Sequence, residues 1–452
     1  MPRPDVQRSV GFWSAVALLV GTTIGGGIFR TPASIAAVMQ DPRLILGLWV
    51  FFGLVSLCGA LTLAELATAM PQTGGLYVYL RAAYGDAAAF VFGWLYMLAA
   101  IPAGMGALAV FFGELLCSIA GIAPADAPWG VPGAAALAIA LLTAANIAGV
   151  RLGSTIQNIF ALLKVGALLA IIGATFLWGN GEVMRWFAAP ASTTGGTGLA
   201  AATKSVMFTF NGWVYISLVA GEIIQPERRL APIIFVGIGT VIGLYLSANL
   251  AYLYLIPLSA MPGTVVAREA MQIVAGPAVG ALVTACILAS VFGALNGAIF
   301  TKSRVAYALA RDGLGFAAVG RIHPSNATPY VSIAIQGAMA MLLVFALRDP
   351  LQPLRLFDRL IAYFVLVEWL ALFFAIAAVF VLRRKLPELP RPFRTPGYPF
   401  VPLFFLAGTA LGLAAILWSA LSRGDFSPLL GLGIAAAGYP VYQLWRRSVP
   451  AG

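Results

Sequence analysis

Apolar windows of about 20 residues recur along this 452-residue chain. One α-helix of that length crosses the ~30 Å hydrocarbon core of a bilayer. The chain is 61% hydrophobic and only 10% charged, whereas a soluble domain has about 25% charged residues. The pattern predicts an all-α membrane protein, a single polytopic domain over 1–452 with twelve transmembrane helices. The predicted spans are 10–39, 44–70, 86–121, 131–149, 153–178, 198–222, 231–257, 277–310, 329–347, 356–382, 398–420 and 427–445.

Three consecutive glycines, Gly25 to Gly27, interrupt the first span. Glycine costs roughly 1 kcal/mol relative to alanine inside a helix, so the run predicts local unwinding. Lipid tolerates such a break only where protein or a water-filled cavity surrounds it. The N–H groups that open the second half-helix then face the break with the positive end of the helix dipole. An anionic group on a small solute fits that position.

A second break is predicted in span 6, where Asn211-Gly212 places a turn signal in mid-membrane. Spans 1 and 6 lie five spans apart. Interrupted helices at matching places in two halves of a chain point to an inverted-repeat transporter with a binding site near the midplane. A channel would lack this pair of broken helices.

Charge sets the predicted orientation. With the N-terminus inside, seventeen of the 27 Lys and Arg residues fall on the cytoplasmic side and eight on the other, as the positive-inside rule requires. Both termini are therefore predicted to be cytoplasmic. The net charge of +11 reflects this topology, and no nucleic-acid partner is expected because no basic surface interleaved with aromatic residues is present.

Cysteine and histidine usage excludes other classes. Cys58, Cys117 and Cys286 all lie in apolar spans without a CxxC or Cys/His cluster, and His323 is the single histidine. Neither a disulfide framework nor a metal site is supported, and no cofactor is expected. An enzyme would need a nucleophile or metal constellation that the sequence lacks.

Several motifs resemble those of the amino acid–polyamine–organocation superfamily, and in particular its L-type amino acid transporters. They are Gly21-Thr-Thr-Ile-Gly-Gly-Gly-Ile-Phe29, Phe208-Thr-Phe-Asn-Gly-Trp213, Gly221-Glu-Ile-Ile-Gln-Pro-Glu-Arg-Arg-Leu-Ala-Pro232 and Phe292-Gly-Ala-Leu-Asn-Gly-Ala-Ile-Phe300. The resemblance implies a five-plus-five inverted repeat (LeuT-type) with discontinuous helices 1 and 6. Its halves would cover about 10–178 and 198–382, with two additional helices in 398–445. It also implies transport of L-amino acids through a site between spans 1, 3, 6, 8 and 10.

The resemblance and the half-helix dipoles together predict how an amino acid is held. Its carboxylate is expected at the N–H groups of Gly26 and Gly27. Its ammonium is expected at backbone carbonyls near Thr22, Thr23, Ile24, Phe208 and Phe210. No ionised side chain is needed for either pole.

Side-chain roles come from the resemblance alone. Phe208 matches the aromatic gate of the family, and Tyr215 and Asn296 match positions of the side-chain pocket. Simple packing is the competing interpretation for Phe208 and Tyr215, because the chain has 28 Phe and 14 Tyr residues.

Two ionisable residues inside spans are singled out, because each such group costs roughly 2.5–3.5 kcal/mol on insertion scales. Lys164, in span 5, matches a lysine that stands where sodium-coupled relatives place a cation, so sodium-independent transport is expected. Snorkelling to the interface is its alternative. Glu368, in span 10, stands where the family usually has a neutral amide. It is interpreted first as a structural carboxylate, with a proton site or a ligand for a polar substrate as alternatives.

Departures from the family narrow the expectation. Residues 121–131 contain no cysteine, so no disulfide-linked heavy subunit is expected, and the chain is interpreted as a prokaryotic transporter of the inner membrane. Spans 1, 3 and 6 carry no acidic cluster, which favours neutral amino acids. A carrier of cationic amino acids or polyamines is the alternative. Exchange and proton coupling both remain open.

Overall fold

The computed structural model describes residues 10–71, 75–122, 127–148, 151–188, 195–215, 217, 223–324, 328–349, 355–424 and 426–448, with side chains omitted at 151–163 and a few other positions. The described chain is helical. Its one element of β structure is an isolated backbone bridge between Val10 and Ile223.

A helix lies in each of the twelve predicted spans. In chain order they are α1 (Phe12–Thr23) with α2 (Gly27–Ala36), α3 (Pro42–Ala69), α5 (Asp86–Leu95) with η1 (Tyr96–Ala100) and α6 (Ile101–Ile119), α7 (Gly130–Ala148), α8 (Arg151–Trp178), α9 (Gly196–Thr209) with η3 (Asn211–Tyr215), α11 (Pro226–Leu255), α13 (Pro277–Arg311), α14 (Tyr330–Ala346), α15 (Leu356–Lys385), α16 (Phe400–Ser422) and α17 (Ser427–Ser448). Among the described residues, eight spans are long and apolar enough to cross a membrane, and two shorter apolar helices cover Lys164–Trp178 and Tyr330–Ala346.

Short helices occupy the connections. They are α4 (Leu76–Tyr84), η2 (Val183–Phe187), η5 (Leu258–Ala260), α12 (Val266–Ala275) and η6 (Ala317–Gly320).

Both predicted breaks are present. α1 ends at Thr23 and α2 begins at Gly27, so the chain leaves the helix over the residues that include two of the three glycines. α9 ends at Thr209, and the chain continues as the 3-10 turn η3. Discontinuous helices 1 and 6 are thus confirmed, although most of the second half of span 6 lies outside the described residues.

Four of the first five spans pack against the span five places later. α3 packs on α11, α6 on α13 and α7 on α14, while α2 contacts α9 and α1 contacts η3. These are spans 2 with 7, 3 with 8, 4 with 9, and 1 with 6. The pairing supports the five-plus-five repeat, whose division at 10–178 and 198–382 stays a prediction.

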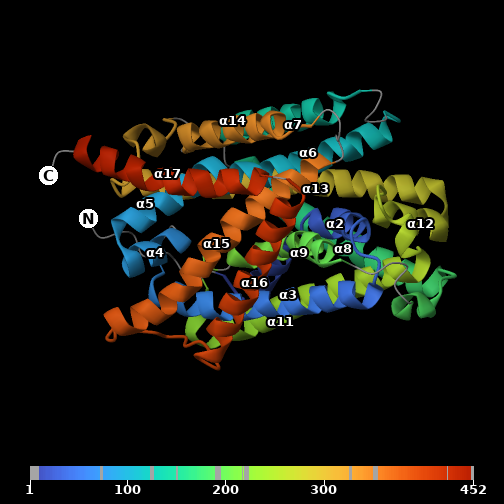
Figure 1. The fold of residues 1–452 in the computed structure, drawn as a ribbon, viewed down its shortest axis with the longest axis horizontal. Coiled ribbons are helices and arrows are strands. Elements are labelled where there is room, and N and C mark those ends of the chain that lie inside the picture. Colours follow the sequence, from blue (N-terminus) through green and yellow to red (C-terminus); the bar gives the residue numbers. More distant parts are fainter. Residues whose placement is uncertain are drawn as a thin grey trace.

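The helices run mostly along the long axis of the molecule. In Figure 1, α7 and α14 lie together along one edge, α3 and α11 along the opposite edge, and α15 crosses between them. The labels for the two chain ends lie at the left, and α12 lies at the right. α12 and the chain ends therefore belong to opposite faces.

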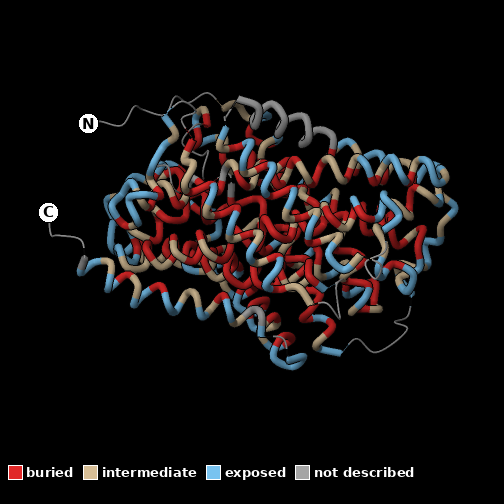
Figure 2. The backbone as a smooth tube through the Cα atoms, turned by 90° about the horizontal axis from the view of Figure 1, so that it is seen from above, coloured by how far each residue is buried: buried red, intermediate tan, exposed pale blue. Residues whose placement is uncertain are grey.

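Burial follows the expectation for helices in lipid. Buried residues run through the middle of the molecule in Figure 2, and exposed residues cover its outside. Those exposed residues include large apolar side chains in mid-helix, among them Leu137, Leu141, Leu282 and Leu411. An apolar outer surface of this kind suits hydrocarbon, while the helices satisfy their own backbone groups.

Candidate functional site

The two helix breaks touch each other through their backbones. A β-carbon on Gly212 would lie 2.3 Å from both the carbonyl oxygen of Thr22 and the α-carbon of Thr23. The hydroxyl of Tyr245, on α11, lies 2.9 Å from the carbonyl oxygen of Thr23 and 3.2 Å from that of Thr209. Tyr245 therefore joins the carboxyl ends of α1 and α9, and the carbonyl of Thr23 has a protein donor within reach.

The other carbonyl positions of the predicted ammonium site are tightly packed. The hydroxyl of Thr22 donates to the carbonyl of Leu18 at 2.8 Å, and Ile24 is fully buried. The ring of Phe210 lies 5.8 Å from that of Trp49 and 5.2 Å from that of Tyr245. Phe210 thus points toward α3 and α11, so any part it plays at the break belongs to its backbone.

The glycines that open α2 face three other helices. A β-carbon on Gly26 would lie 3.0 Å from Phe111 of α6 and 3.1 Å from Val291 of α13, and one on Gly27 would lie 2.8 Å from the hydroxyl of Thr209. A β-carbon on Gly25 would meet nothing within 4 Å. The first N–H groups of a helix have no acceptor within it, and the binding of a carboxylate by those of Gly26 and Gly27 stays a prediction.

An aromatic column borders the break on its α15 side. The ring of Phe208 packs edge-on against Phe357 and Phe364, at 5.7 Å from each. These two residues lie two turns apart on one face of α15. Arg30 lies over the ring of Phe357 at 5.1 Å, and the ammonium of Lys302 lies over that of Phe364 at 5.0 Å. Phe208 therefore points into the protein, with a cation beyond each neighbouring ring.

A cavity of about 980 Å³ adjoins this column at Arg30. Residues of α2, α6, α9 and α12 and the adjoining ends of α15 and α16 line it. Since α12 lies at the face opposite the chain ends (Figure 1), the cavity belongs to that face. Arg30 and Glu114 line it and form a bidentate ion pair, Nε to Oε2 at 2.7 Å and Nη2 to Oε1 at 3.3 Å. The pair joins α2 to α6 between the cavity and Phe357.

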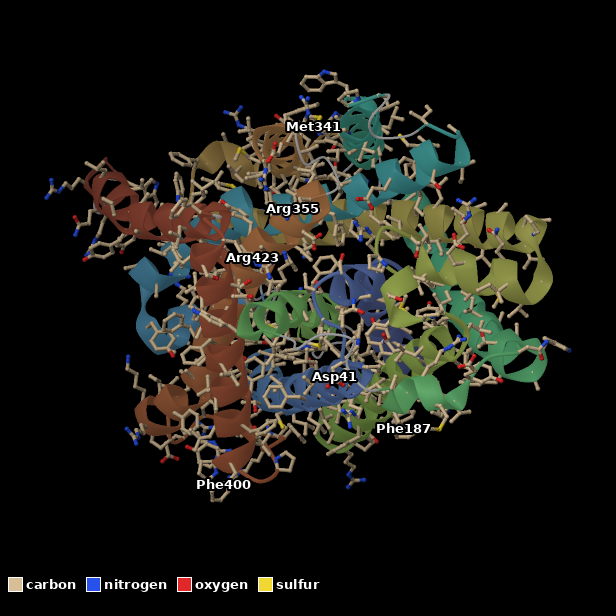
Figure 3. The ribbon with its side chains drawn as sticks, turned by 45° about the vertical axis from the view of Figure 1, so that its right-hand side comes forward. Asp41, Phe187, Met341, Arg355, Phe400 and Arg423 are labelled. Carbon is tan, nitrogen blue, oxygen red and sulfur yellow. The ribbon has the colours of Figure 1, made fainter. Side chains whose placement is uncertain are left out.

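The cavity is predominantly basic. Its lining includes Arg30, Lys204, Arg268, Arg355, Arg359 and Arg423, against Glu114, Glu269 and Asp358. Figure 3 labels two of these residues, Arg355 at the start of α15 and Arg423 at the end of α16. A concave surface lined by one sign of charge raises the local concentration of solutes of the opposite sign.

Lys164 is buried and reaches the first break. Its ammonium donates to the carbonyl oxygen of Gly21 at 3.0 Å, and only 3% of the residue is exposed. α8 packs against both α1 and α13. The bond to α1 is seen directly, and snorkelling does not describe a lysine this deeply buried.

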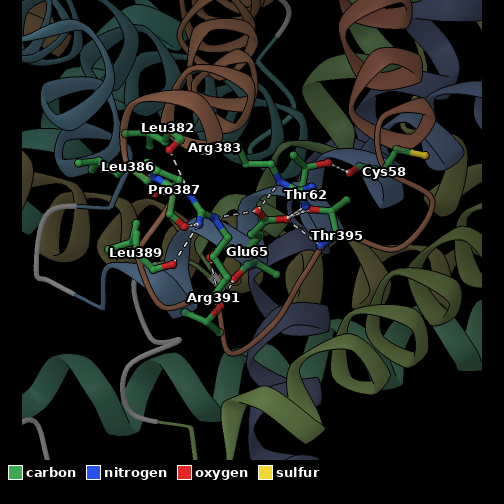
Figure 4. Close-up of polar contacts among 12 residues, drawn as sticks. Cys58, Thr62, Glu65, Leu382, Arg383, Leu386, Pro387, Leu389, Arg391 and Thr395 are labelled. Atoms are coloured by element: carbon green, nitrogen blue, oxygen red, sulfur yellow. Dashed lines mark hydrogen bonds and ion pairs between the residues drawn. The ribbon is translucent and has the colours of Figure 1, made fainter.

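Two buried carboxyl groups differ sharply in their surroundings. Glu65 of α3 accepts hydrogen bonds from two guanidinium nitrogens of Arg383, at 2.9 and 2.7 Å. It also accepts from the backbone N–H and the hydroxyl of Thr395, at 2.8 and 2.7 Å. Arg391 adds an ion pair at 3.6 Å. This network, drawn in Figure 4, fixes α3 to the end of α15 and the following loop. Glu65 is thus a structural ion-pair residue.

Glu368 of α15 is also buried, with 2% exposed, but it forms no ion pair in the described structure. Its Oε1 accepts from the hydroxyl of Tyr96 at 2.5 Å and from the side-chain amide of Asn211 at 3.4 Å. Among the described residues, neither its Oε2 nor the Oδ1 of Asn211, both of them buried, has a hydrogen-bond partner. The structural interpretation of Glu368 therefore leaves half of the carboxyl group unsatisfied.

The two predicted pocket residues are placed differently. The side-chain oxygen of Asn296, on α13, accepts from the amide of Asn146 on α7 at 2.7 Å, so Asn296 is engaged with span 4. The side chain of Tyr215 lies outside the described residues. The pocket roles of both residues stay predictions.

Sequence reasoning missed several residues that build the site, among them Tyr245, Phe357, Phe364 and Tyr96. The aromatic residues carry no motif. Tyr96 had a signal in Pro102: proline lacks the N–H that would bond the carbonyl of residue 98, and η1, a π-helical turn, lies at that place. Such turns are frequent at functional sites.

Two broken helices that cross at a buried centre, below a cavity on one face, define a secondary membrane transporter of the inverted-repeat class. The chain belongs to the amino acid permease family, whose model matches residues 10–434. It is similar to the serine/threonine exchanger SteT of Bacillus subtilis, with 30% identity over 97% of this chain and 96% of the relative. It also resembles the human large neutral amino acids transporter small subunit 2 (29%, covering 97% and 80%) and the mouse b(0,+)-type amino acid transporter 1 (29%, covering 91% and 83%).

Proposed function

We propose that this protein exchanges neutral L-amino acids across the membrane by sodium-independent alternating access. The observation that carries the proposal is the pair of broken helices, whose ends offer N–H groups on one side and carbonyl groups on the other. An amino acid presents one negative and one positive group at that spacing, so the half-helix ends can hold its backbone without an ionised side chain. The similarity to a serine/threonine exchanger supports exchange of small neutral substrates.

The charge of the cavity argues against the alternative of cationic amino acids or polyamines. Six basic residues and three acidic residues line it, which repels a polycation and attracts a carboxylate. No cluster of acidic side chains is present at the described break to receive a second positive charge.

Substrate would enter from the cavity, pass the Arg30–Glu114 pair and be covered by Phe208. We place the cavity on the extracellular side, because both termini are predicted to be cytoplasmic and the cavity lies on the face opposite them. The membrane is then the inner membrane of a bacterial cell, and the chain acts without a disulfide-linked heavy subunit. Lys164 supplies the fixed positive charge beside span 1.

The test is counterflow in proteoliposomes. Vesicles loaded with one unlabelled amino acid are given a trace of labelled substrate outside, and a panel of neutral, cationic and acidic amino acids and polyamines is compared. Accumulation of label only in vesicles preloaded with neutral amino acids supports the proposal. Equal uptake into empty vesicles would replace exchange by uniport, and counterflow only with lysine, arginine or a polyamine would replace the substrate class.

A further inference from the structure

Glu65 and Glu368 are both buried, but in the described structure only Glu65 is paired with a cation. An ionised carboxylate is costly to bury unless it is paired and hydrogen-bonded. Glu65 receives a bidentate guanidinium and two further donors. Glu368 receives one hydroxyl and one distant amide, both on the same oxygen.

The unsatisfied atoms around Glu368 match one another. Oε2 of Glu368 and Oδ1 of Asn211 are both buried acceptors that receive no hydrogen bond from the part of the chain that the structure describes, and the two side chains already approach through Oε1 and Nδ2. One proton on Oε2 would supply the missing donor and remove the charge. The acid and the amide could then form two antiparallel hydrogen bonds, with Asn211 as donor and acceptor.

Several other charged groups near α15 are paired with one another. On the elements packed against it, Glu114 of α6 pairs with Arg30, Lys204 of α9 with Asp358, Glu65 of α3 with Arg383, and Arg81 beside Tyr77 of α4 with Asp86 and Asp312. α17 contributes Tyr439, Tyr442, Arg446 and Arg447, α14 contributes Tyr330, and α16 has no ionisable side chain. Further ionisable residues on these elements are Arg43 and Cys58 of α3, Cys117 of α6, and Tyr79 and Tyr84 of α4. The ammonium of Lys302, on α13, lies over Phe364, one turn from Glu368.

We propose that Glu368 is a proton-binding site and that protonation of its carboxyl group determines how α15 contacts the break in span 6. The proton comes from water, binds Oε2 and converts the carboxylate to a neutral acid, and it returns to water on release. The protonated acid ties α15 to Asn211, and Tyr96 ties the same group to the π-helical turn of span 3. Spans 3, 6 and 10 are thus held together in this conformation when the proton is bound.

Loss of the proton leaves a buried negative charge facing the carbonyl of Asn211, which favours any arrangement in which α15 separates from η3 and water reaches Glu368. The proton is therefore predicted to favour the conformation with the open cavity. The resulting dependence of exchange on pH rests on the proposed function, whereas the protonation state of Glu368 does not.

Infrared difference spectroscopy of the purified full-length protein tests the protonation state without any substrate. The spectrum of the wild type minus that of Glu368→Gln is expected to contain a carboxylic-acid C=O band that shifts in deuterated water. Tyr96→Phe should move this band to higher frequency, because the hydroxyl donates to the carbonyl oxygen Oε1. A difference spectrum with carboxylate bands alone, at acidic as well as neutral pH, would overturn the proposal.

Exchange measured across a pH series tests the coupling. Gln keeps an acceptor for Tyr96 and a donor for Asn211, so Glu368→Gln should transport with a flat pH profile. The wild-type rate should fall with rising pH, by up to about tenfold per unit once Glu368 loses its one proton. Glu388→Gln, at an exposed carboxylate of the loop after α15, should keep the wild-type profile. If Glu368→Gln responds to pH as the wild type does, the coupling is absent, whereas failure of counterflow with every amino acid would reject the proposed function and leave the infrared result standing.

Discussion

Gly212 packs directly on the backbone of Thr22, so closely that a β-carbon at residue 212 would lie 2.3 Å from the carbonyl oxygen of Thr22. The obstructing atoms are backbone atoms and cannot rotate away. Gly212→Ala should therefore separate α1 from η3 or destabilise the fold, at a cost on the order of 1–3 kcal/mol or more. The melting temperature in detergent is the measurement. Gly243→Ala on α11, where a β-carbon meets nothing within 4 Å, is the matched control and should melt as the wild type does.

The start of α2 offers a comparison between adjacent glycines. Gly25→Ala should be tolerated, because its β-carbon would meet nothing within 4 Å, whereas Gly26→Ala must displace Phe111 and Val291. We expect substrate affinity to fall at least about tenfold in Gly26→Ala, equivalent to 1.4 kcal/mol, with little change in Gly25→Ala. Binding is measured by scintillation proximity with purified protein. Equal affinity in the two variants would remove the proposed carboxylate site from the opening of α2.

Phe208→Ala should impair transport more than equilibrium binding. The ring fills the space between Phe357 and Phe364, and its loss opens a path from the cavity without removing a polar contact. We expect the exchange rate to fall by about tenfold or more while the dissociation constant changes less, which makes the loss mainly one of occlusion. Phe208→Leu, which retains apolar volume, should recover part of the rate. A dissociation constant that rises in proportion to the loss of rate would make Phe208 a binding residue and not a gate.

Lys164→Met should cut turnover sharply. Methionine keeps much of the apolar volume but leaves the carbonyl of Gly21 without its donor, at a cost of roughly 1–3 kcal/mol for the unpaired buried group. Exchange is compared in sodium and in sodium-free choline buffer at one pH. The wild type should be equally active in both. A wild-type protein that stops when sodium is removed would show that Lys164 does not stand in for an ion.

The sequence was most informative about backbone features. The positions of the twelve spans and of both helix breaks follow from apolar length and from glycine and asparagine, because lipid leaves the backbone few alternatives. Gly26 and Gly27 were predicted as a carboxylate site, and their close packing on Phe111, Val291 and Thr209 was not predicted. Those contacts join residues far apart in the chain, and no local pattern encodes them.

Side-chain roles were predicted less completely. Glu368 was noted as a departure from its family, but its partners Tyr96 and Asn211 come from two other spans. Arg30 and Glu114 are separated by 84 positions, and only the tertiary fold brings them together. Phe210 was assigned to the site with Phe208, yet residues two apart in a helix lie about 200° apart around its axis, so the two rings face opposite neighbours, α11 and α15.

The π-helical turn at Tyr96–Ala100 determines the angular setting of everything that follows it in span 3. Each residue of an α-helix advances the chain by about 100° around its axis, and a π turn closes over one residue more than an α turn, so rewinding the turn as α-helix without a deletion would rotate α6 by about that amount relative to α5. Phe111 would then leave Gly26, and Glu114 would leave Arg30, without any change to either pair. The one extra residue in this turn thus determines which face of α6 is directed toward the break and the cavity.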